Sequence, residues 1–180
     1  MSRYQLFYCE ENVWWLCQEP RFADAKSWVV FISNHARQCA VWQQRAADPG
    51  EPVVWDYHVV LLVEGMVWDL DTRLGFPVSL DDYLRASFRA LPPELSHLTP
   101  RFRVVRRDEF VSTFATDRSH MRSDRGWRAP PPSWEPPGEG MNLMRFVDMD
   151  ADFVGHVASL ERLLASTGGD PPCDGRGDSL

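Results

Sequence analysis

The sequence predicts a single-domain α/β protein in which a mainly antiparallel sheet is flanked by helices. The chain has 180 residues, the size of one ordinary domain, and 44% of them are apolar, which is enough to fill a core. Two β-rich runs joined by a glycine-containing pair predict a hairpin, and apolar residues at helical spacing recur between the predicted strands. We expect the domain to span residues 1–165 and residues 166–180 to form a flexible tail.

The hairpin is the strongest strand signal in the chain. Residues 53–63 (VVWDYHVVLLV) are rich in β-branched side chains, residues 66–71 (MVWDLD) alternate between apolar and polar, and Glu64-Gly65 joins the two runs. Shorter apolar runs predict two further strands, over residues 28–32 and 101–106.

The first helix is predicted over residues 9–18, where apolar residues recur at helical spacing. Glu10 and Glu11 lie in its first turn, and carboxylates there suit the positive end of the helix dipole. Further helices are predicted over residues 35–47, 80–91 and 155–164, with a short helix or turn over 109–115.

Residues 117–140 form a long irregular segment that is rich in proline. Loops of this length without secondary structure are usually functional or disordered. Because the segment also contains Trp127 and Trp134, we expect it to be pinned to the body of the protein.

The charge and the apolar runs of the chain exclude several classes of protein. With 19 basic and 26 acidic residues the net charge is −7, and such a surface repels phosphate backbones, so we expect no binding of nucleic acid. No apolar run approaches the ~20 residues needed to cross a bilayer. The first residues show no signal-peptide pattern, so we expect a cytoplasmic protein without membrane contact.

Cysteine chemistry is the first candidate for a function. The chain has Cys9, Cys17, Cys39 and Cys173, none of them in a CxxC pair, so a zinc ribbon is not indicated. Cys9 stands at the predicted start of a helix, where a lowered thiol pKa would make it a nucleophile. The alternative is that Cys9 is simply a buried structural cysteine, as most free cysteines are.

The predicted hairpin brings an imidazole close to two carboxylates. With a two-residue turn, His58 lies opposite Asp71 and diagonal to Asp69, and both neighbours are close enough to interact. A carboxylate beside an imidazole fixes its tautomer and stabilises the imidazolium. The alternatives are a hydrogen-bonded core histidine and a solvated pair of acids.

Cys9, His58 and one aspartate supply a nucleophile, a base and an orienting acid in the chain order of papain-like and transglutaminase-like sites. In such sites the cysteine opens a helix that packs against a sheet, which predicts an α-β-α sandwich of this type and attack on an acyl carbon through a thioester. No metal-ligand spacing supports a zinc site, and no cofactor is expected. His120 could line a pocket, although a pair between Asp117 and Arg118 that fixes its loop is the simpler interpretation of that segment.

Several blocks of the sequence occur together in one family: YCEENVW at 8–14, VFISN at 30–34, PVVWDYHVVLL at 52–62, DLDT at 69–72, FP at 76–77, FATDRSHM at 114–121 and PPP at 130–132. In these blocks the chain resembles the protein N-terminal glutamine amidohydrolases over most of residues 4–156. The resemblance implies a single α/β domain that converts N-terminal Gln of proteins and peptides to Glu and releases ammonia.

The resemblance also implies a Cys–His–Asp triad, which falls here on Cys9, His58 and Asp69. We therefore choose Asp69 over Asp71, which the hairpin geometry alone slightly favours, because a slip of register would change the pairing. In eukaryotic members of the family the product Glu feeds an arginylation-dependent degradation pathway, the N-degron route.

Discrimination against internal Gln requires recognition of a free α-ammonium, which a buried carboxylate does well. Asp71 and Asp56 are the predicted contacts of this amine, and structural hydrogen bonding is their alternative role. The expected partners are proteins or peptides with N-terminal Gln, and we expect a monomer. The rival functions are a papain-like peptidase, a transglutaminase-type acyl transferase and a non-catalytic peptide-binding module.

Overall fold

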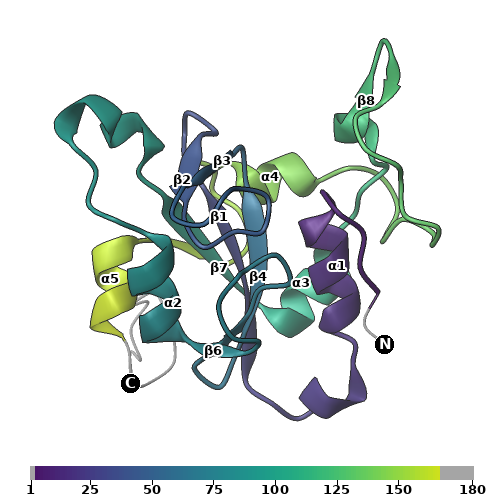
Figure 1. Ribbon diagram of the computed structural model, residues 1–180. Helices are drawn as coiled ribbons and strands as arrows, with labels where there is room; N and C mark the ends of the chain where they lie inside the picture. The colour runs from purple at the N-terminus through teal and green to yellow at the C-terminus, as the bar shows by residue number, and fades with distance from the viewer. Residues whose placement is uncertain (1–2, 167–180) are drawn as a thin grey trace.

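The computed structural model of the protein describes residues 3–166 and is built around a six-stranded sheet (Figure 1). All neighbouring strands are antiparallel, and across the sheet they follow the order β10 (His156–Ser159), β7 (Arg101–Arg106), β1 (Ser27–Ser33), β4 (His58–Val63), β5 (Met66–Trp68), β6 (Val78–Ser79). Helices lie on both sides of this sheet, so the predicted single-domain α/β class is confirmed.

Side-chain alternation along β4 divides the core into two layers. Val59 and Leu61 belong to one apolar cluster, and Val60 and Leu62 belong to the other. Because both faces are covered, every residue of β4 is buried. The first layer is covered by α1 (Cys9–Leu16), α3 (Arg107–Thr113) and α4 (Leu143–Val147), and the second by α2 (Leu80–Ser87) and α5 (Leu160–Ala165).

Smaller elements surround the sheet. They are the paired strands β2 (Cys39–Val41) and β3 (Val53–Trp55), the paired strands β8 (Arg122–Ser123) and β9 (Gly126–Trp127), and the 3-10 turns η1 (Pro20–Phe22), η2 (Pro93–Leu98) and η3 (Ser119–Met121). No helix among residues 3–166 is both long and apolar enough to span a membrane.

The hairpin is confirmed, with the turn at Glu64 and Gly65. Val63 pairs with Met66 directly across it. Both turn residues have left-handed backbones, with φ of 49° and 79°, and this geometry suits the twist of a two-residue hairpin. The turn therefore fixes the register that decides what lies opposite His58.

The predicted helix over residues 35–47 is wrong. Its centre forms β2, and Gln43 has a left-handed backbone with φ of 59°. The Gln43 carbonyl accepts a hydrogen bond of 2.6 Å from the Arg73 N–H, and the Arg45 N–H donates to the Asp71 carbonyl. The backbone groups of this segment are thus paired with distant residues, which an apolar pattern read locally does not reveal.

The two halves of the hairpin are shorter than predicted. Residues 53–63 are two strands in different sheets, β3 and β4, because the chain bends at Asp56 and Tyr57. The partner strand ends at Trp68, so Asp69 and Asp71 lie beyond the ladder.

The helix predicted over 80–91 ends at Ser87, since Phe88 adopts an extended backbone with φ of −130°. The helix predicted over 155–164 is wrong in its first half, because residues 156–159 form strand β10, which pairs with β7, and α5 starts only at Leu160. The side chain of Ser159 caps α5 by accepting a hydrogen bond from the Arg162 N–H. The predicted tail and Cys173 lie outside the described residues, apart from Ser166.

Candidate active site

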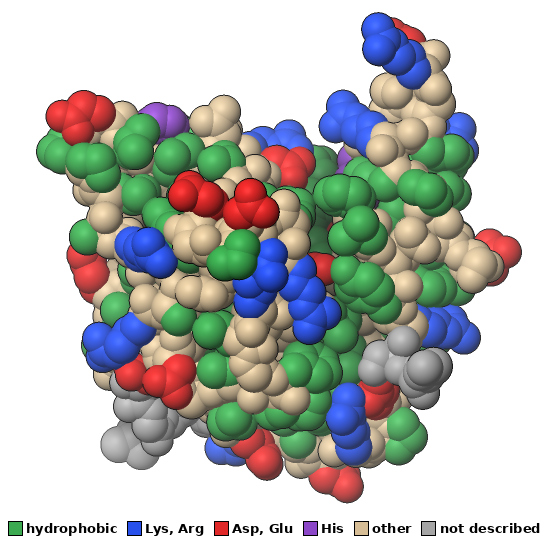
Figure 2. Space-filling model, viewed as in Figure 1, with side chains coloured by type: hydrophobic (Ala, Val, Ile, Leu, Met, Phe, Trp, Pro, Cys, Tyr) green, Lys and Arg blue, Asp and Glu red, His purple; other side chains and the backbone are tan. Residues whose placement is uncertain are grey.

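A cavity of about 270 Å³ opens at the N-terminal end of α1. Its lining brings together segments that are far apart in the sequence: Leu6, Phe7, Cys9, Arg37, Trp55, Asp56, Tyr57, His58, Asp71, His120, Met121, Arg128, Ala129 and Met144. Near it the β8–β9 hairpin projects from the body and carries basic side chains at its tip (Figure 2). Cys9, His58, Asp71 and Asp56 thus lie around one space.

Cys9 is the first residue of α1 and is half-buried. Its sulfur donates a hydrogen bond to Oε2 of Glu10 over 3.7 Å. Burial, followed by the charges of Glu10 and Asp71, holds the pKa of the Cys9 thiol well above its ordinary value. The expectation that the helix start lowers this pKa is therefore wrong, since burial and the nearby carboxylates raise it.

His58 is the first residue of β4, and its imidazole bonds directly to Asp69. The distance from Nε2 of His58 to Oδ1 of Asp69 is 3.0 Å, and both residues are 1% exposed. The imidazole also stacks on the ring of Trp55, with ring centres 5.8 Å apart. Nε2 is therefore occupied by the carboxylate, which leaves Nδ1 as the other nitrogen of the ring.

Both oxygens of the Asp69 carboxylate have hydrogen-bond partners in the protein. Its Oδ1 also accepts the Asp71 N–H at 2.9 Å, which folds the chain back where the ladder stops. Its Oδ2 accepts Nε2 of Gln44 and the hydroxyl of Tyr83, each at 2.9 Å. This turn, and not the strand alternation that we assumed, presents Asp69 to His58.

The imidazole and the carboxylate shift each other's pKa in opposite directions. Burial lowers the pKa of His58, but the charge and hydrogen bond of Asp69 raise it more, so the pKa lies above its ordinary value. Burial raises the pKa of Asp69. The charge and hydrogen bond of His58, together with hydrogen bonds from Gln44 and the Asp71 N–H, lower this pKa by more than burial raises it, so the net shift is downward. The pair is thus stabilised as an ion pair.

The two shifts predict how the stability of the protein depends on pH. The Asp69 contribution is present above its ordinary pKa of 3.8 and is lost as pH falls through the lowered value. The His58 contribution is present below 6.5 and is lost as pH rises through the raised value. We expect the free energy of unfolding of the wild type, minus that of Asp69→Asn, to be largest between these limits, as measured by denaturant titration at a series of pH values. A difference that does not change with pH would contradict the ion pair.

Asp71 and Asp56 line the same cavity but differ in exposure. Asp71 is 8% exposed, and its Oδ1 accepts the Tyr4 hydroxyl at 2.5 Å. Burial and this carboxylate raise the pKa of Tyr4. Asp56 is exposed, and its Oδ1 accepts the Tyr57 N–H at 3.0 Å. Asp71 is the more desolvated of the two acids.

His58, Asp69 and Asp71 could each offer one ligand atom to a metal ion, and these atoms lie within 4.8 Å of one another. However, both oxygens of Asp69 already accept hydrogen bonds from protein donors. The oxygens of Asp69 are therefore committed to protein groups, and the His58 imidazole is one of them.

Comparison with known proteins shows where the chain belongs. A family model described as N-terminal glutamine amidase matches residues 4–167. The chain belongs to this family. It is 40% identical over 162 residues to the protein N-terminal glutamine amidohydrolase of Bos taurus, covering 83% of this chain and 78% of that protein. This chain is also similar to proteins of the same name from two other organisms. It is 39% identical to that of Homo sapiens, covering 82% of this chain and 78% of that protein, and 40% identical to that of Danio rerio, covering 85% of this chain and 88% of that protein.

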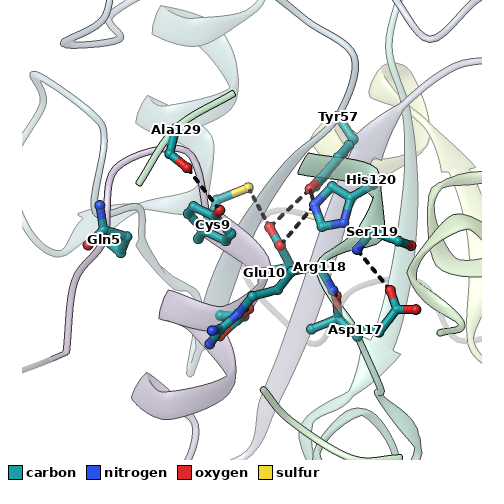
Figure 3. Close-up of polar contacts among 12 residues, drawn as sticks. Gln5, Cys9, Glu10, Tyr57, Asp117, Arg118, Ser119, His120 and Ala129 are labelled. Carbon is teal, nitrogen blue, oxygen red and sulfur yellow. Dashed lines mark hydrogen bonds and ion pairs between the residues drawn. The ribbon is translucent and has the colours of Figure 1, made fainter. Parts of the chain in front are cut away.

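In this member of the N-terminal glutamine amidase family, the prediction that His120 could line a pocket is confirmed. The site also contains Glu10, Tyr57, Gln44 and Tyr83, for which the sequence predicts no role at the site. Glu10, Tyr57 and His120 contact one another beside Cys9 (Figure 3). Gln44 and Tyr83 hold Asp69 from outside the cavity. Buried polar side chains within apolar segments were the available signal for these residues. The signal does not show which residues they contact, because their partners lie far away in the sequence.

The irregular segment after α3 is pinned to α1 by a buried ion pair. Arg118 donates from Nε and Nη2 to the two carboxylate oxygens of Glu11 at 2.7 and 2.8 Å, and Trp134 Nε1 donates to Glu11 Oε2 at 2.8 Å. Asp117, which we expected to pair with the arginine, instead accepts the Ser119 N–H. The pinning prediction is confirmed for Trp134, whereas Trp127 is 39% exposed.

Removal of the Arg118 charge is expected to destabilise the protein and to loosen one wall of the cavity. Arg118→Met keeps most of the side-chain stem but leaves the buried Glu11 carboxylate unpaired, which we expect to lower the free energy of unfolding by about 3 kcal/mol. The exposed Arg162→Met is the matched control and should change it by less than ~0.5 kcal/mol. Urea unfolding measures both, and equal stability of the two variants would contradict the anchoring role.

Proposed function

We propose that this protein hydrolyses the side-chain amide of N-terminal Gln in proteins and peptides, giving Glu and ammonia. The observation that carries the proposal is that the cavity is lined by both Cys9 and the imidazole of the His58–Asp69 pair. Membership of the N-terminal glutamine amidase family supports the choice of substrate. The proposed enzyme is a monomer in the cytoplasm that requires no cofactor.

The proposed reaction passes through a thioester. The Cys9 thiol gives its proton to Nδ1 of a neutral His58 ring, which creates the imidazolium that Asp69 stabilises, and the sulfur forms a bond to the carboxamide carbon of the substrate. His58 then returns a proton to the departing nitrogen, the carbon–nitrogen bond breaks, and ammonia leaves. In the second half His58 takes a proton from water and the hydroxide attacks the thioester. The carbon–sulfur bond breaks, Glu is released, and His58 returns the proton to the Cys9 sulfur.

The start of α1 supplies a donor for the negative oxygen of each tetrahedral intermediate. The Asn12 N–H donates the hydrogen bond of 2.9 Å to the Tyr8 carbonyl that closes the first turn. The Cys9 N–H comes before Asn12 in the chain, so it is one of the first N–H groups of the helix, which have no acceptor within the helix. We propose it as one donor of the oxyanion hole.

Asp71 is the proposed contact of the substrate α-ammonium, with Asp56 as a second, more exposed contact. Loss of a charged hydrogen bond of this kind is worth about 1.5–3 kcal/mol, so we expect Asp71→Asn to raise KM for a Gln-initiated peptide by about ten- to a hundredfold. The control is Asp24→Asn, at an exposed acid outside the cavity. Steady-state ammonia release measures both variants, and an unchanged KM in Asp71→Asn would remove Asp71 from substrate recognition.

A peptide series tests the substrate class. We expect ammonia release from a peptide with free N-terminal Gln and none from the same peptide with an acetylated N-terminus or with Gln only inside the chain. A peptide that starts with Asn, shorter by one methylene, should react about 10- to 200-fold more slowly. Equal turnover of free and acetylated peptides would refute amine recognition. Cleavage of the peptide bond, or cross-linking to a lysine, would instead support a peptidase or a transglutaminase.

A further inference from the structure

The Cys9 sulfur borders a second carboxylate–imidazole pair, which the proposed reaction does not use. Nε2 of His120 lies 3.5 Å from Oε1 of Glu10, and the Tyr57 hydroxyl lies 3.1 Å from Oε2 of Glu10 and 3.3 Å from Nε2 of His120 (Figure 3). The Cys9 sulfur lies 3.7 Å from the same Glu10 oxygen, Oε2. A carboxylate therefore separates the thiol from the second imidazole.

The charge of Glu10 requires a partner. The residue is fully buried, and within residues 3–166 its Oε1 accepts no hydrogen bond. An unpaired buried carboxylate is strongly unfavourable, and its negative charge opposes formation of a thiolate at Cys9. Arg118, two residues before His120, is already committed to both oxygens of Glu11.

His120 is placed to supply the missing positive charge. Its side chain is 11% exposed and lines the cavity. The Tyr57 hydroxyl donates its proton to Glu10, so the hydroxyl oxygen is free to accept a hydrogen bond from Nε2–H of His120. That arrangement puts a proton on the nitrogen that faces Glu10, as an ion pair requires.

We propose that His120 is the counter-ion of Glu10 and that, by neutralising this carboxylate, it allows Cys9 to form the thiolate. His120 acts through Glu10 and not on the substrate, so it is a positioning residue. The inference rests on the proposed role of Cys9 as nucleophile. Besides Glu10 and Tyr57, His120 has charged or titratable neighbours in its own loop, Asp117 and Arg118. Those in the cavity lining are Cys9, Arg37, Asp56, His58, Asp71 and Arg128.

Alkylation of Cys9 tests this inference without the use of a substrate. The rate of carboxamidomethylation by iodoacetamide is measured over a range of pH in the full chain, with mass spectrometry of the Cys9 peptide as the readout. We expect His120→Gln to raise the pKa of the thiol by about one unit or more and to slow the reaction at neutral pH by about tenfold. The same substitution at the exposed His97 is the control and should leave the profile unchanged.

Rescue separates this electrostatic role from a structural one. In the double variant His120→Gln/Glu10→Gln the carboxylate no longer needs a counter-ion, so the alkylation rate should return to the wild-type rate or exceed it. Removal of a second partner from a merely structural network would not restore the rate. An unchanged profile in His120→Gln, or a double variant as slow as His120→Gln, would overturn the proposal.

The single variant Glu10→Gln covers the case in which His120→Gln does not fold. Without the carboxylate, the Cys9 thiol should be alkylated at neutral pH at least as fast as in the wild type, and slower alkylation would overturn the proposal. Neither readout depends on ammonia release. A protein that fails to deamidate Gln peptides but shows the expected alkylation profile would refute the proposed function and leave this inference standing.

Discussion

Replacement of Cys9 by alanine is expected to abolish ammonia release from Gln-initiated peptides. The sulfur is the atom that would bond to the substrate, and loss of the nucleophile from a triad lowers kcat by about a millionfold. Because Cys9 is half-buried at the first turn of α1 and α1 packs through Val13 and Leu16, the variant should remain folded. Ammonia release and the circular dichroism spectrum are the two measurements.

Cys17 provides the matched control for this substitution. It caps the other end of α1, is buried in the core, and lines no part of the cavity described above. We expect Cys17→Ala to lose about 1 kcal/mol of stability and to keep its activity. Measurable turnover by Cys9→Ala would contradict covalent catalysis at this sulfur, whatever the behaviour of the control.

Asp69→Asn is expected to lower kcat by about a thousand- to ten-thousandfold with little change in KM. An asparagine keeps the volume but neither fixes the His58 tautomer nor stabilises the imidazolium, and the corresponding change in other triads has an effect of this size. The substitution also replaces carboxylate oxygens, one of which accepts hydrogen bonds from Gln44 and Tyr83, with an amide whose NH₂ group can only donate. Steady-state kinetics on a Gln-initiated peptide measure the effect.

Tyr83→Phe separates the two roles of this carboxylate. The substitution removes one hydrogen bond to Oδ2 of Asp69 and leaves the His58 contact at Oδ1 in place. We expect it to destabilise the protein by about 1 kcal/mol and to lower kcat by less than tenfold. An Asp69→Asn variant as active as Tyr83→Phe would show that the carboxylate does not assist His58.

The sequence predicts those parts of the site that depend on local pattern. Glu64-Gly65 is a strong turn signal between apolar runs, and it fixes the hairpin that carries His58 towards Asp69. The alternation of apolar and polar residues could not predict whether Asp69 or Asp71 contacts His58. The strand pairing ends at Trp68, and a local turn after it decides which carboxylate reaches the imidazole.

Contacts that join distant segments could not be predicted in this way. Glu11 and Arg118 are 107 positions apart, and Tyr57 and His120 are 63 apart, so neither pair leaves a local pattern. The raised thiol pKa at Cys9 has the same origin. The sequence shows the helix start that would lower this pKa, whereas burial by the surrounding segments, which raises it, appears only in the folded chain.

Incubation of the wild-type enzyme with a short peptide that starts with Gln tests the central claim most directly. The peptide mass is followed by mass spectrometry while free ammonia is assayed in the same sample. The account predicts that the N-terminal residue changes to Glu, with one ammonia released per peptide and no cut in the backbone. A peptide that keeps its mass, or that is cleaved without ammonia, would contradict it.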